Sequence, residues 1–116
     1  MKQGLTIQEA AETTGWSPRM LRYLESVGLI EPPRNGAGYR IYRPGELQRL
    51  RTLRELLDRH GLGPSDVAFA KRMRTESELE DAVARWLEEK AKRPADVHAS
   101  GWLDYEQQKH QRLLAV

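Results

Sequence analysis

The stretch from Ser17 to Gly28 constrains this chain most strongly, because its start and stop signals leave room only for a short helix. Ser17 is a good N-cap, and Pro18 suits the first helical position, where a missing amide donor costs nothing. Gly28 is typical of the residue that ends a helix in a left-handed conformation. The helical period places Met20, Leu21, Leu24 and Val27 on one face and Arg19, Arg22, Tyr23 and Ser26 on the other. The pattern predicts a short helix over 18–27 with an apolar inner face and a basic, aromatic outer face.

A second short helix is predicted just before this one. Thr6 and Glu9 form a capping-box pattern, which places a helix start immediately after Thr6. Gly15 ends this helix and leaves a tight connection, in which Trp16 is expected to be a core aromatic. Two short helices joined by a glycine-containing turn are typical of a helix-turn-helix.

A basic hairpin is predicted after the two helices. Its turn is Arg34-Asn35-Gly36-Ala37-Gly38, and the segment from Tyr39 to Arg43 is typical of a short strand. Because side chains alternate along a strand, Arg40 and Tyr42 are expected on one face and Ile41 on the inner one. A helix can enter a groove of duplex DNA while a hairpin holds the backbone. The residues of this helix face and hairpin expected to contact DNA are Arg19, Arg22, Tyr23, Arg34, Asn35, Arg40, Tyr42 and Arg43; the alternative is that the charged ones are ordinary surface charges.

The charge distribution favours double-stranded DNA as the partner of the first half. The chain has 19 Lys+Arg and 17 Asp+Glu, a net +2 that by itself indicates no partner. Between Gly15 and Arg54, however, eight arginines face three glutamates, a local balance of +5. From Gly61 onward nine basic residues face ten acidic ones, which gives −1. The positive field therefore belongs to the first half, as expected where a protein meets phosphates.

No site for other chemistry is predicted. The chain has no cysteine, and its histidines, His60, His98 and His110, are far apart, so we expect no metal and no cofactor. No nucleophile–base set or phosphate-cradling loop is recognisable, so we expect no catalytic residues and no enzyme. The N-terminus lacks an apolar segment and no 18-residue apolar run exists. We therefore expect a cytoplasmic, nucleoid-associated protein without membrane contact.

The second half is predicted to be helical. A leucine stripe after Pro44 predicts a helix that His60-Gly61 ends, and a short fourth helix is expected from Gly63-Pro64-Ser65. Thr75 and Glu78 repeat the capping-box pattern and predict a helix over 75–93. Its apolar face carries Leu79, Val83, Trp86 and Leu87. That face forms either a seam between two subunits, which we favour, or a stripe folded back on the same chain.

Residues 94–116 are expected to form a tail with a weak helical pattern after Trp102. Its apolar side chains, Trp102, Tyr105, Leu113 and Val116, could dock onto a dimer, bind another protein or remain disordered. The chain is thus predicted to comprise a DNA-binding domain (1–74), a dimerisation helix (75–93) and this tail (94–116).

Residues from about 5 to 74 resemble the MerR family of bacterial transcription regulators. The resemblance is carried by three ordered motifs: Thr6-Ile7-x-Glu9-Ala10-Ala11, Gly15-x-Ser17-x-x-x-Leu21-Arg22-Tyr23-x-Glu25-x-x-Gly28-Leu29-Ile30, and Pro33-Arg34-Asn35-x-x-Gly38-Tyr39-Arg40-x-Tyr42. It implies a winged-helix domain, a homodimer joined by an antiparallel coiled coil, and a pseudo-palindromic promoter site. Leu24 replaces the second tyrosine of the family's usual Arg-Tyr-Tyr run, and the helix after Thr75 is short, with no sensor region expected after it.

This resemblance implies that the N-terminal turn of the second helix faces the major groove with Ser17, Pro18 and Arg19. It also implies that Arg22 and Tyr23 contact phosphates. Arg19 is the candidate for a base edge, because a guanidinium can bond guanine O6 and N7 together. We therefore expect a mostly α-helical, winged helix-turn-helix regulator that binds promoter DNA as a homodimer. The alternatives are an architectural or excisionase-like DNA-binding protein and a module that binds a protein partner through its tail.

Overall fold

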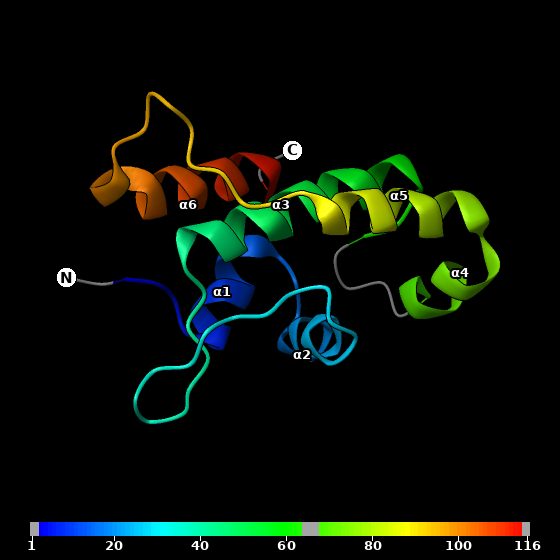
Figure 1. Cartoon of the computed structure of the whole chain (residues 1–116), viewed down its shortest axis with the longest axis horizontal. Helices are drawn as coiled ribbons and strands as arrows, with labels where there is room; N and C mark the ends of the chain where they lie inside the picture. The colour runs from blue at the N-terminus through cyan, green and yellow to red at the C-terminus, as the bar shows by residue number, and fades with distance from the viewer. Residues whose placement is uncertain (1–2, 64–67, 115–116) are drawn as a thin grey trace.

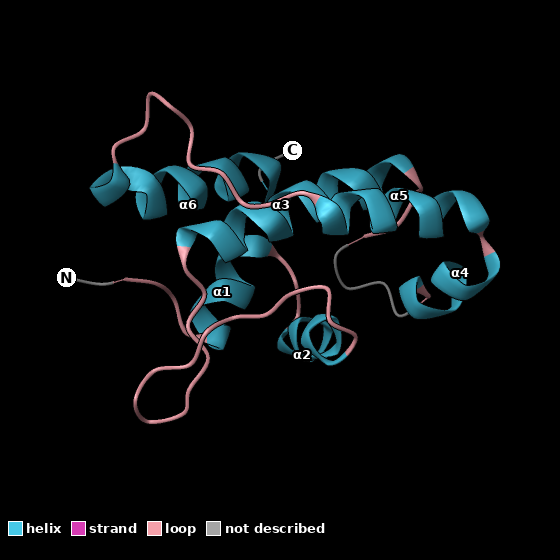
Figure 2. Ribbon diagram, in the orientation of Figure 1, coloured by secondary structure: helices cyan, strands magenta, loops and turns pink. Residues whose placement is uncertain are grey.

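The computed structural model describes residues 3–63 and 68–114 and is mostly helical (Figures 1 and 2). These residues form α1 (Ile7–Thr14), α2 (Pro18–Ser26), α3 (Pro44–Arg59), α4 (Phe69–Thr75), α5 (Ser77–Glu88), the 3-10 turn η1 (Ala99–Gly101) and α6 (Trp102–Leu114). Within residues 3–63 and 68–114 no strand forms, and two isolated antiparallel bridges replace the expected hairpin strand: Leu5 with Tyr42, and Arg34 with Arg40. The start expected for the fourth helix falls on residues 64–67, outside the described part of the chain.

Local capping signals set the first two helices, as predicted. The Thr6 hydroxyl accepts from the Glu9 amide at 3.1 Å, and the Glu9 carboxylate accepts from the Thr6 amide at 3.0 Å. Gly15 ends α1 with a φ of 81°, and the Ser17 hydroxyl caps α2. The predicted helix-turn-helix is therefore present, with residues 15–17 as its turn.

Helix α2 ends at Ser26, one residue earlier than predicted, and the last buried residue of its inner face is Leu24. Met20, Leu21 and Leu24 are buried, but Val27 is 49% exposed. Val27 is the C-cap, with φ −98° and ψ 6°, and Gly28 follows with a φ of 79°. Because the chain leaves helical geometry at Val27, its side chain turns away from the core.

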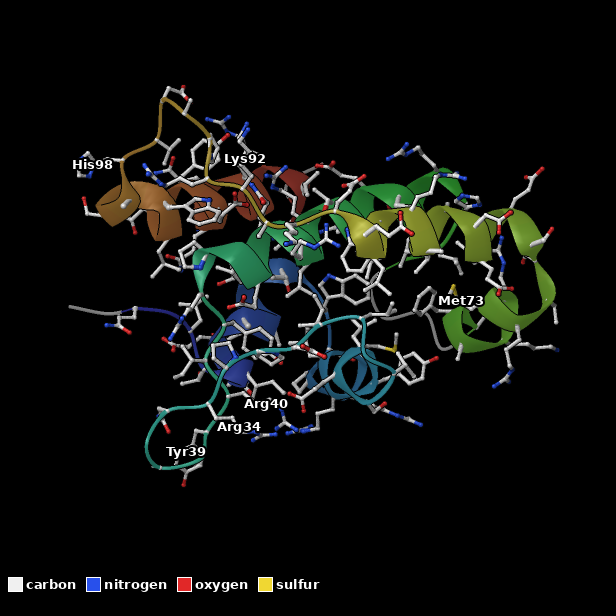
Figure 3. All side chains as sticks on the ribbon, in the orientation of Figure 1. Arg34, Tyr39, Arg40, Met73, Lys92 and His98 are labelled. Carbon is white, nitrogen blue, oxygen red and sulfur yellow. The ribbon has the colours of Figure 1, made fainter. Side chains whose placement is uncertain are left out.

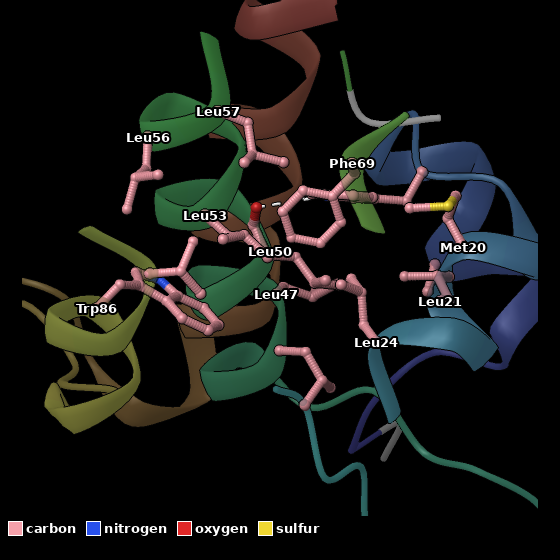
Figure 4. Close-up of a cluster of buried hydrophobic side chains, with 14 of the residues drawn as sticks. Met20, Leu21, Leu24, Leu47, Leu50, Leu53, Leu56, Leu57, Phe69 and Trp86 are labelled. Carbon is pink, nitrogen blue, oxygen red and sulfur yellow. Dashed lines mark hydrogen bonds between the residues drawn. The ribbon is translucent and has the colours of Figure 1, made fainter. Parts of the chain in front are cut away.

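Helix α3 is the centre of the hydrophobic core. Its leucine stripe is buried along the whole helix, through Leu47, Leu50, Leu53, Leu56 and Leu57. Side chains of α2 pack on one side of it and Trp86 of α5 on the other, as the close-up in Figure 4 shows. Each such leucine contributes about 1.5–3 kcal/mol by leaving water, so α3 holds the helix-turn-helix and the second half together.

Helix α5 folds back on its own chain, which corrects the preferred interpretation of its apolar face. Leu79, Val83 and Trp86 are 0–3% exposed within the single chain, whereas Leu87 is 47% exposed. The indole nitrogen of Trp86 donates to the Thr52 hydroxyl at 2.8 Å. Three of the four residues predicted for a subunit seam are thus buried against the same chain, because α3 offers them a second apolar side.

The bounds of α5 also differ from the prediction of a helix over 75–93. Thr75 lies in the last turn of α4, where its hydroxyl donates to the Lys71 carbonyl at 3.2 Å, so the predicted capping box with Glu78 is wrong. At the other end the chain becomes extended at Glu89, five residues before Pro94. The turn of helix expected there is replaced by an extended strap.

The strap, residues 89–98, crosses the start of α3. Gln48 holds it through two hydrogen bonds: its amide nitrogen donates to the Lys92 carbonyl at 2.6 Å, and its oxygen accepts from the Lys92 amide at 2.7 Å. Gly45 makes the close crossing possible, since a Cβ there would lie 3.2 Å from the Cβ of Ala91. These contacts outweigh the helical propensity of residues 89–93.

The tail forms α6, which packs along α1 and α3 (Figure 1). Its buried residues are polar rather than the predicted aromatic stripe: Glu106 and His110 are both 0% exposed. The Glu106 carboxylate accepts from Arg51 Nε at 3.0 Å and from the Trp102 indole at 3.2 Å. Burial lowers the pKa of His110, so the ring is neutral, and its Nε2–H donates to the Leu47 carbonyl at 2.8 Å.

Candidate nucleic-acid interface

Helix α2 and the loop of residues 33–42 lie together at one end of the molecule, away from α6 (Figure 1). On the outer face of α2, Arg19 and Arg22 are exposed. Ser17 and Pro18 are half-buried at its first turn, where the Ser17 hydroxyl accepts from the Met20 amide at 3.1 Å. The first turn therefore presents the Arg19 side chain, while the Ser17 hydroxyl is occupied as the cap.

The 33–42 loop is shaped by Asn35. Its side-chain oxygen accepts from the amides of Ala37 at 2.9 Å and Tyr39 at 3.1 Å, and its own amide donates to the Tyr39 carbonyl at 2.9 Å. Gly38 adopts a φ of 88°, which lets the chain reverse without strain. Asn35 was predicted to contact DNA, and here its oxygen instead closes the loop that displays Arg34 and Arg40.

Glu25 of α2 gathers both loop arginines. Arg40 Nε lies 3.0 and 3.1 Å from the two carboxylate oxygens of Glu25, and Arg40 Nη2 lies 3.0 Å from Oε1. Arg34 Nη2 is 3.4 Å from the same oxygen, and its Nη1 donates to the Gly38 carbonyl at 3.0 Å. The hydrogen bond that Arg40 donates to Glu25 raises the pKa of Arg40. The loop is thus attached to α2 by ionic contacts of Arg34 and Arg40, which Figure 3 labels near one another.

Tyr42 does not share the surface with Arg40, contrary to the prediction. Its ring is 0% exposed, and its backbone pairs with Leu5, N to O at 2.8 Å in both directions. Residues 40 and 42 pair with different segments rather than along one strand, so their side chains do not share a face as expected. Ile41, expected inside, is only half-buried. The Tyr42 hydroxyl is therefore a core group and not a phosphate partner.

Replacing Tyr42 with phenylalanine is expected to raise the free energy of unfolding by about 1 kcal/mol at pH 7, because the buried hydroxyl has no hydrogen-bond partner among residues 3–63 and 68–114. Burial also raises the pKa of Tyr42 to about 12, above its ordinary 10.0. The folded wild type thus loses stability as the pH rises from 10 toward 12, whereas the variant lacks this loss. Urea unfolding at pH 7 and pH 11 tests both effects; a less stable variant at pH 7 would show that the hydroxyl is satisfied.

Three of the four arginines of α3 are held by contacts within the protein. Arg49 stacks on the Trp86 ring at 3.9 Å, Arg51 pairs with Glu106, and Arg54 Nη1 donates to the carbonyl of Thr14 at 3.3 Å. The positive balance counted over residues 15–54 therefore overstates the exposed field. Arg43, predicted to contact DNA, is exposed and makes no ion pair with any described residue.

Tyr23 has a packing role beside its predicted one. Its ring meets the Phe69 ring edge-on, with centroids 6.2 Å apart and planes at 85°. The side chain is half-buried, so it joins the helix-turn-helix to α4.

Two residues of the candidate interface were missed from the sequence. Tyr39 is 71% exposed at the loop tip beside Arg34 and Arg40, as the labelled side chains in Figure 3 show. An aromatic directly after a turn glycine could have indicated it. Glu25 carried no such signal, because its partners are 9 and 15 residues away and depend on the loop conformation.

The described residues offer no other site of a recognisable class. Over residues 3–63 and 68–114, no three His, Cys, Asp or Glu side chains are grouped so that they could hold a metal ion. Every helix in these two ranges is too short or too polar to cross a membrane.

Comparison with known proteins identifies the same part of the chain. Residues 5–71 match the family model described as MerR HTH family regulatory protein. A segment of 49 residues, 42% of this chain, is 43% identical to the HTH-type transcriptional regulator HmrR of Rhizobium leguminosarum bv. viciae and covers 38% of it. A segment of 55 residues, 47% of this chain, is 40% identical to the heavy metal-dependent transcription regulator 2 of Rhizobium meliloti and covers 37% of it.

An uncharacterised HTH-type transcriptional regulator of Pseudomonas aeruginosa is 40% identical over 55 residues, which cover 47% of this chain and 42% of that protein. The matches thus span about two fifths of each relative's length. The names of these relatives describe transcription regulators. No solved structure matches the chain significantly.

Proposed function

The chain belongs to the MerR family of helix-turn-helix regulatory proteins, and on this premise we propose that it regulates transcription by binding promoter DNA. In the proposed complex α2 enters the major groove, and the 33–42 loop acts as the wing on the adjacent backbone. The residues that we propose to contact DNA are those predicted from the sequence on α2 and in this loop, without the buried Tyr42.

One observation carries this proposal: the arginines of α2 and of the wing converge. Glu25 of α2 contacts both Arg34 and Arg40 of the loop, so the loop arginines lie next to the helix that carries Arg19 and Arg22. Arg22 and Arg34 are exposed, and Arg40 is partly so. A cluster of guanidinium groups on one surface suits phosphate oxygens, which they can bond in bidentate fashion.

Arg19 is proposed to read a base and the others to hold the backbone. It is exposed in the first turn of α2, the part of a recognition helix that reaches base edges. Replacing Arg19 with alanine is expected to weaken binding to the preferred site by about 1–3 kcal/mol and to relax the preference at one base position. Competition titrations with single-base variants of the site measure this; an equal loss on every sequence would assign Arg19 to a phosphate instead.

We propose a homodimer as the form that binds an inverted repeat, by analogy with the family. The α5 face buried in this chain does not support a coiled-coil seam, so the dimer contact would use other surfaces, such as that around Leu87. The same burial favours a second candidate function: an architectural protein that binds direct repeats cooperatively without a stable dimer.

Selection of bound sites from random duplex DNA, followed by sizing of the complex, tests both candidates. An inverted repeat bound by two chains supports the regulator. Direct repeats bound by an open-ended number of chains support the architectural protein. Absence of enrichment at about 50–100 mM salt, where phosphate contacts are strong, would refute DNA binding.

A protein partner for the tail stays a prediction from the sequence. The inner face of α6 already packs on α1 and α3, so such a partner would use the outer face, where Leu114 is 43% exposed.

A further inference from the structure

The Glu25 carboxylate is the polar connection between α2 and the wing. Its two oxygens bond Arg40 through Nε and Nη2 and meet Arg34 through Nη2. Within residues 3–63 and 68–114, no other hydrogen bond or ion pair joins α2 to residues 34–41. Among the described residues, the polar contacts between α2 and the loop therefore come from one side chain, whereas the base of the loop is held by the pairing of Tyr42 with Leu5.

A carboxylate at this place has two opposite consequences for an anionic ligand. As a negative charge it repels phosphates, so its removal alone would tighten binding. As an anchor it restricts two long, flexible side chains, so its removal would increase the entropy cost of ordering them on a phosphate. If a neutral residue at position 25 weakens DNA binding, the anchoring role dominates. If it tightens DNA binding, the charge repulsion dominates.

We propose that Glu25 is a positioning residue of the DNA interface, which holds Arg40 and Arg34 so that one surface of guanidinium groups faces the phosphates. This inference rests on the proposed function, because it concerns the same interface.

The geometry leaves the arginines able to bind while they are held. A guanidinium has five N–H donors in a planar fork. Arg40 uses its Nε and Nη2 edge for Glu25, and its Nη1 meets no acceptor among the described residues. The Arg40 and Glu25 side chains are 24% and 23% exposed and that of Arg34 is 49% exposed, so the cluster borders solvent. An ion cluster that borders solvent contributes modestly to folding stability, which favours a role in orientation.

The test compares Glu25→Gln with Glu31→Gln, on duplex DNA carrying the selected site. Glu31 is a matched control: it lies between α2 and the wing, is exposed, makes no ion pair with any described residue, and its replacement changes the charge equally. We expect Glu25→Gln to bind about tenfold more weakly than the wild type, the size of one charge-assisted hydrogen bond. Glu31→Gln should bind as tightly as the wild type or slightly more tightly.

The salt dependence separates a positioning role from a general loss of structure. Because an arginine that is no longer held would bind its phosphate less often, the slope of log affinity against log salt should become shallower by about one in Glu25→Gln. The thermal unfolding midpoint of this variant should stay close to that of the wild type. Binding that tightens as in Glu31→Gln would overturn the inference, because Glu25 would then act only as a local charge.

A double-mutant cycle with Arg40→Gln shows whether Glu25 acts through Arg40. If it does, the loss in the double variant is smaller than the product of the two single losses. Independent, multiplying losses would overturn the inference while leaving the proposed function intact. A wild type that binds no DNA would instead overturn the proposed function, and the inference with it.

Discussion

Replacing Trp86 with alanine is expected to lower the free energy of unfolding by about 4 kcal/mol, the usual cost of deleting a buried tryptophan. The indole is 3% exposed, donates to Thr52, and supports the Arg49 guanidinium at 3.9 Å on its face. The deletion would therefore remove apolar packing, a hydrogen bond and a cation–π interaction together. Urea unfolding followed by circular dichroism measures the loss.

The same variant decides between the two interpretations of the α5 face. If Trp86 packs within one chain, the loss is the same at every protein concentration. If it packs in a subunit seam, the unfolding midpoint of the wild type rises with concentration and that of the variant does not. Trp86→Phe is the matched control: it fills much of the space but lacks the N–H, so its loss should be nearer 1 kcal/mol, about the net value of one hydrogen bond.

Replacing Glu106 with glutamine is expected to cost about 3 kcal/mol, the lower end for breaking a buried ion pair by removing one partner. Glu106 is fully buried, and Arg51 is 16% exposed, so water can replace the missing anion only poorly. A glutamine would also turn an amide N–H₂ toward the guanidinium or the Trp102 indole, both of which are donors. Hydrogen exchange should show the α6 amides opening first.

Glu55→Gln is the control for this change, because Glu55 also pairs with Arg51, at 3.4 Å, but has a side chain that is 43% exposed. Its loss should stay below about 1 kcal/mol. Equal losses in Glu106→Gln and Glu55→Gln would show that the buried carboxylate does not hold α6 in place.

The ends of the first two helices could be predicted from the sequence, because the residues that set them are local. The hydroxyl caps at Thr6 and Ser17 and the glycines at 15 and 28 lie within a few residues of the helix ends that they set. Their effect needs no knowledge of the rest of the chain, so the helix-turn-helix could be predicted from them. The family resemblance then extended this prediction to the exposed arginines of α2 and the wing.

The errors concern contacts between distant segments. Tyr42 was assigned to the surface because alternation along a strand places it on the same face as Arg40, whereas Tyr42 pairs with Leu5 and Arg40 with Arg34. Residues 89–93 have helical propensity, but Gln48, far earlier in the chain, holds them extended. Glu106 and His110 appear as surface residues in any polarity pattern, because their partners Arg51 and Leu47 become known only once α6 is docked.

The docking of α6 also has a consequence for the order of folding. Its bond from His110 to the Leu47 carbonyl joins residues 63 positions apart, and the Arg51–Glu106 pair spans 55. Closing loops of this length costs more entropy than forming the neighbouring α1–α2 turn. Contacts that form after the rate-limiting step alter the unfolding rate and leave the folding rate nearly unchanged. We therefore expect that loosening α6 shortens the lifetime of the folded protein while the chain still folds at its usual speed.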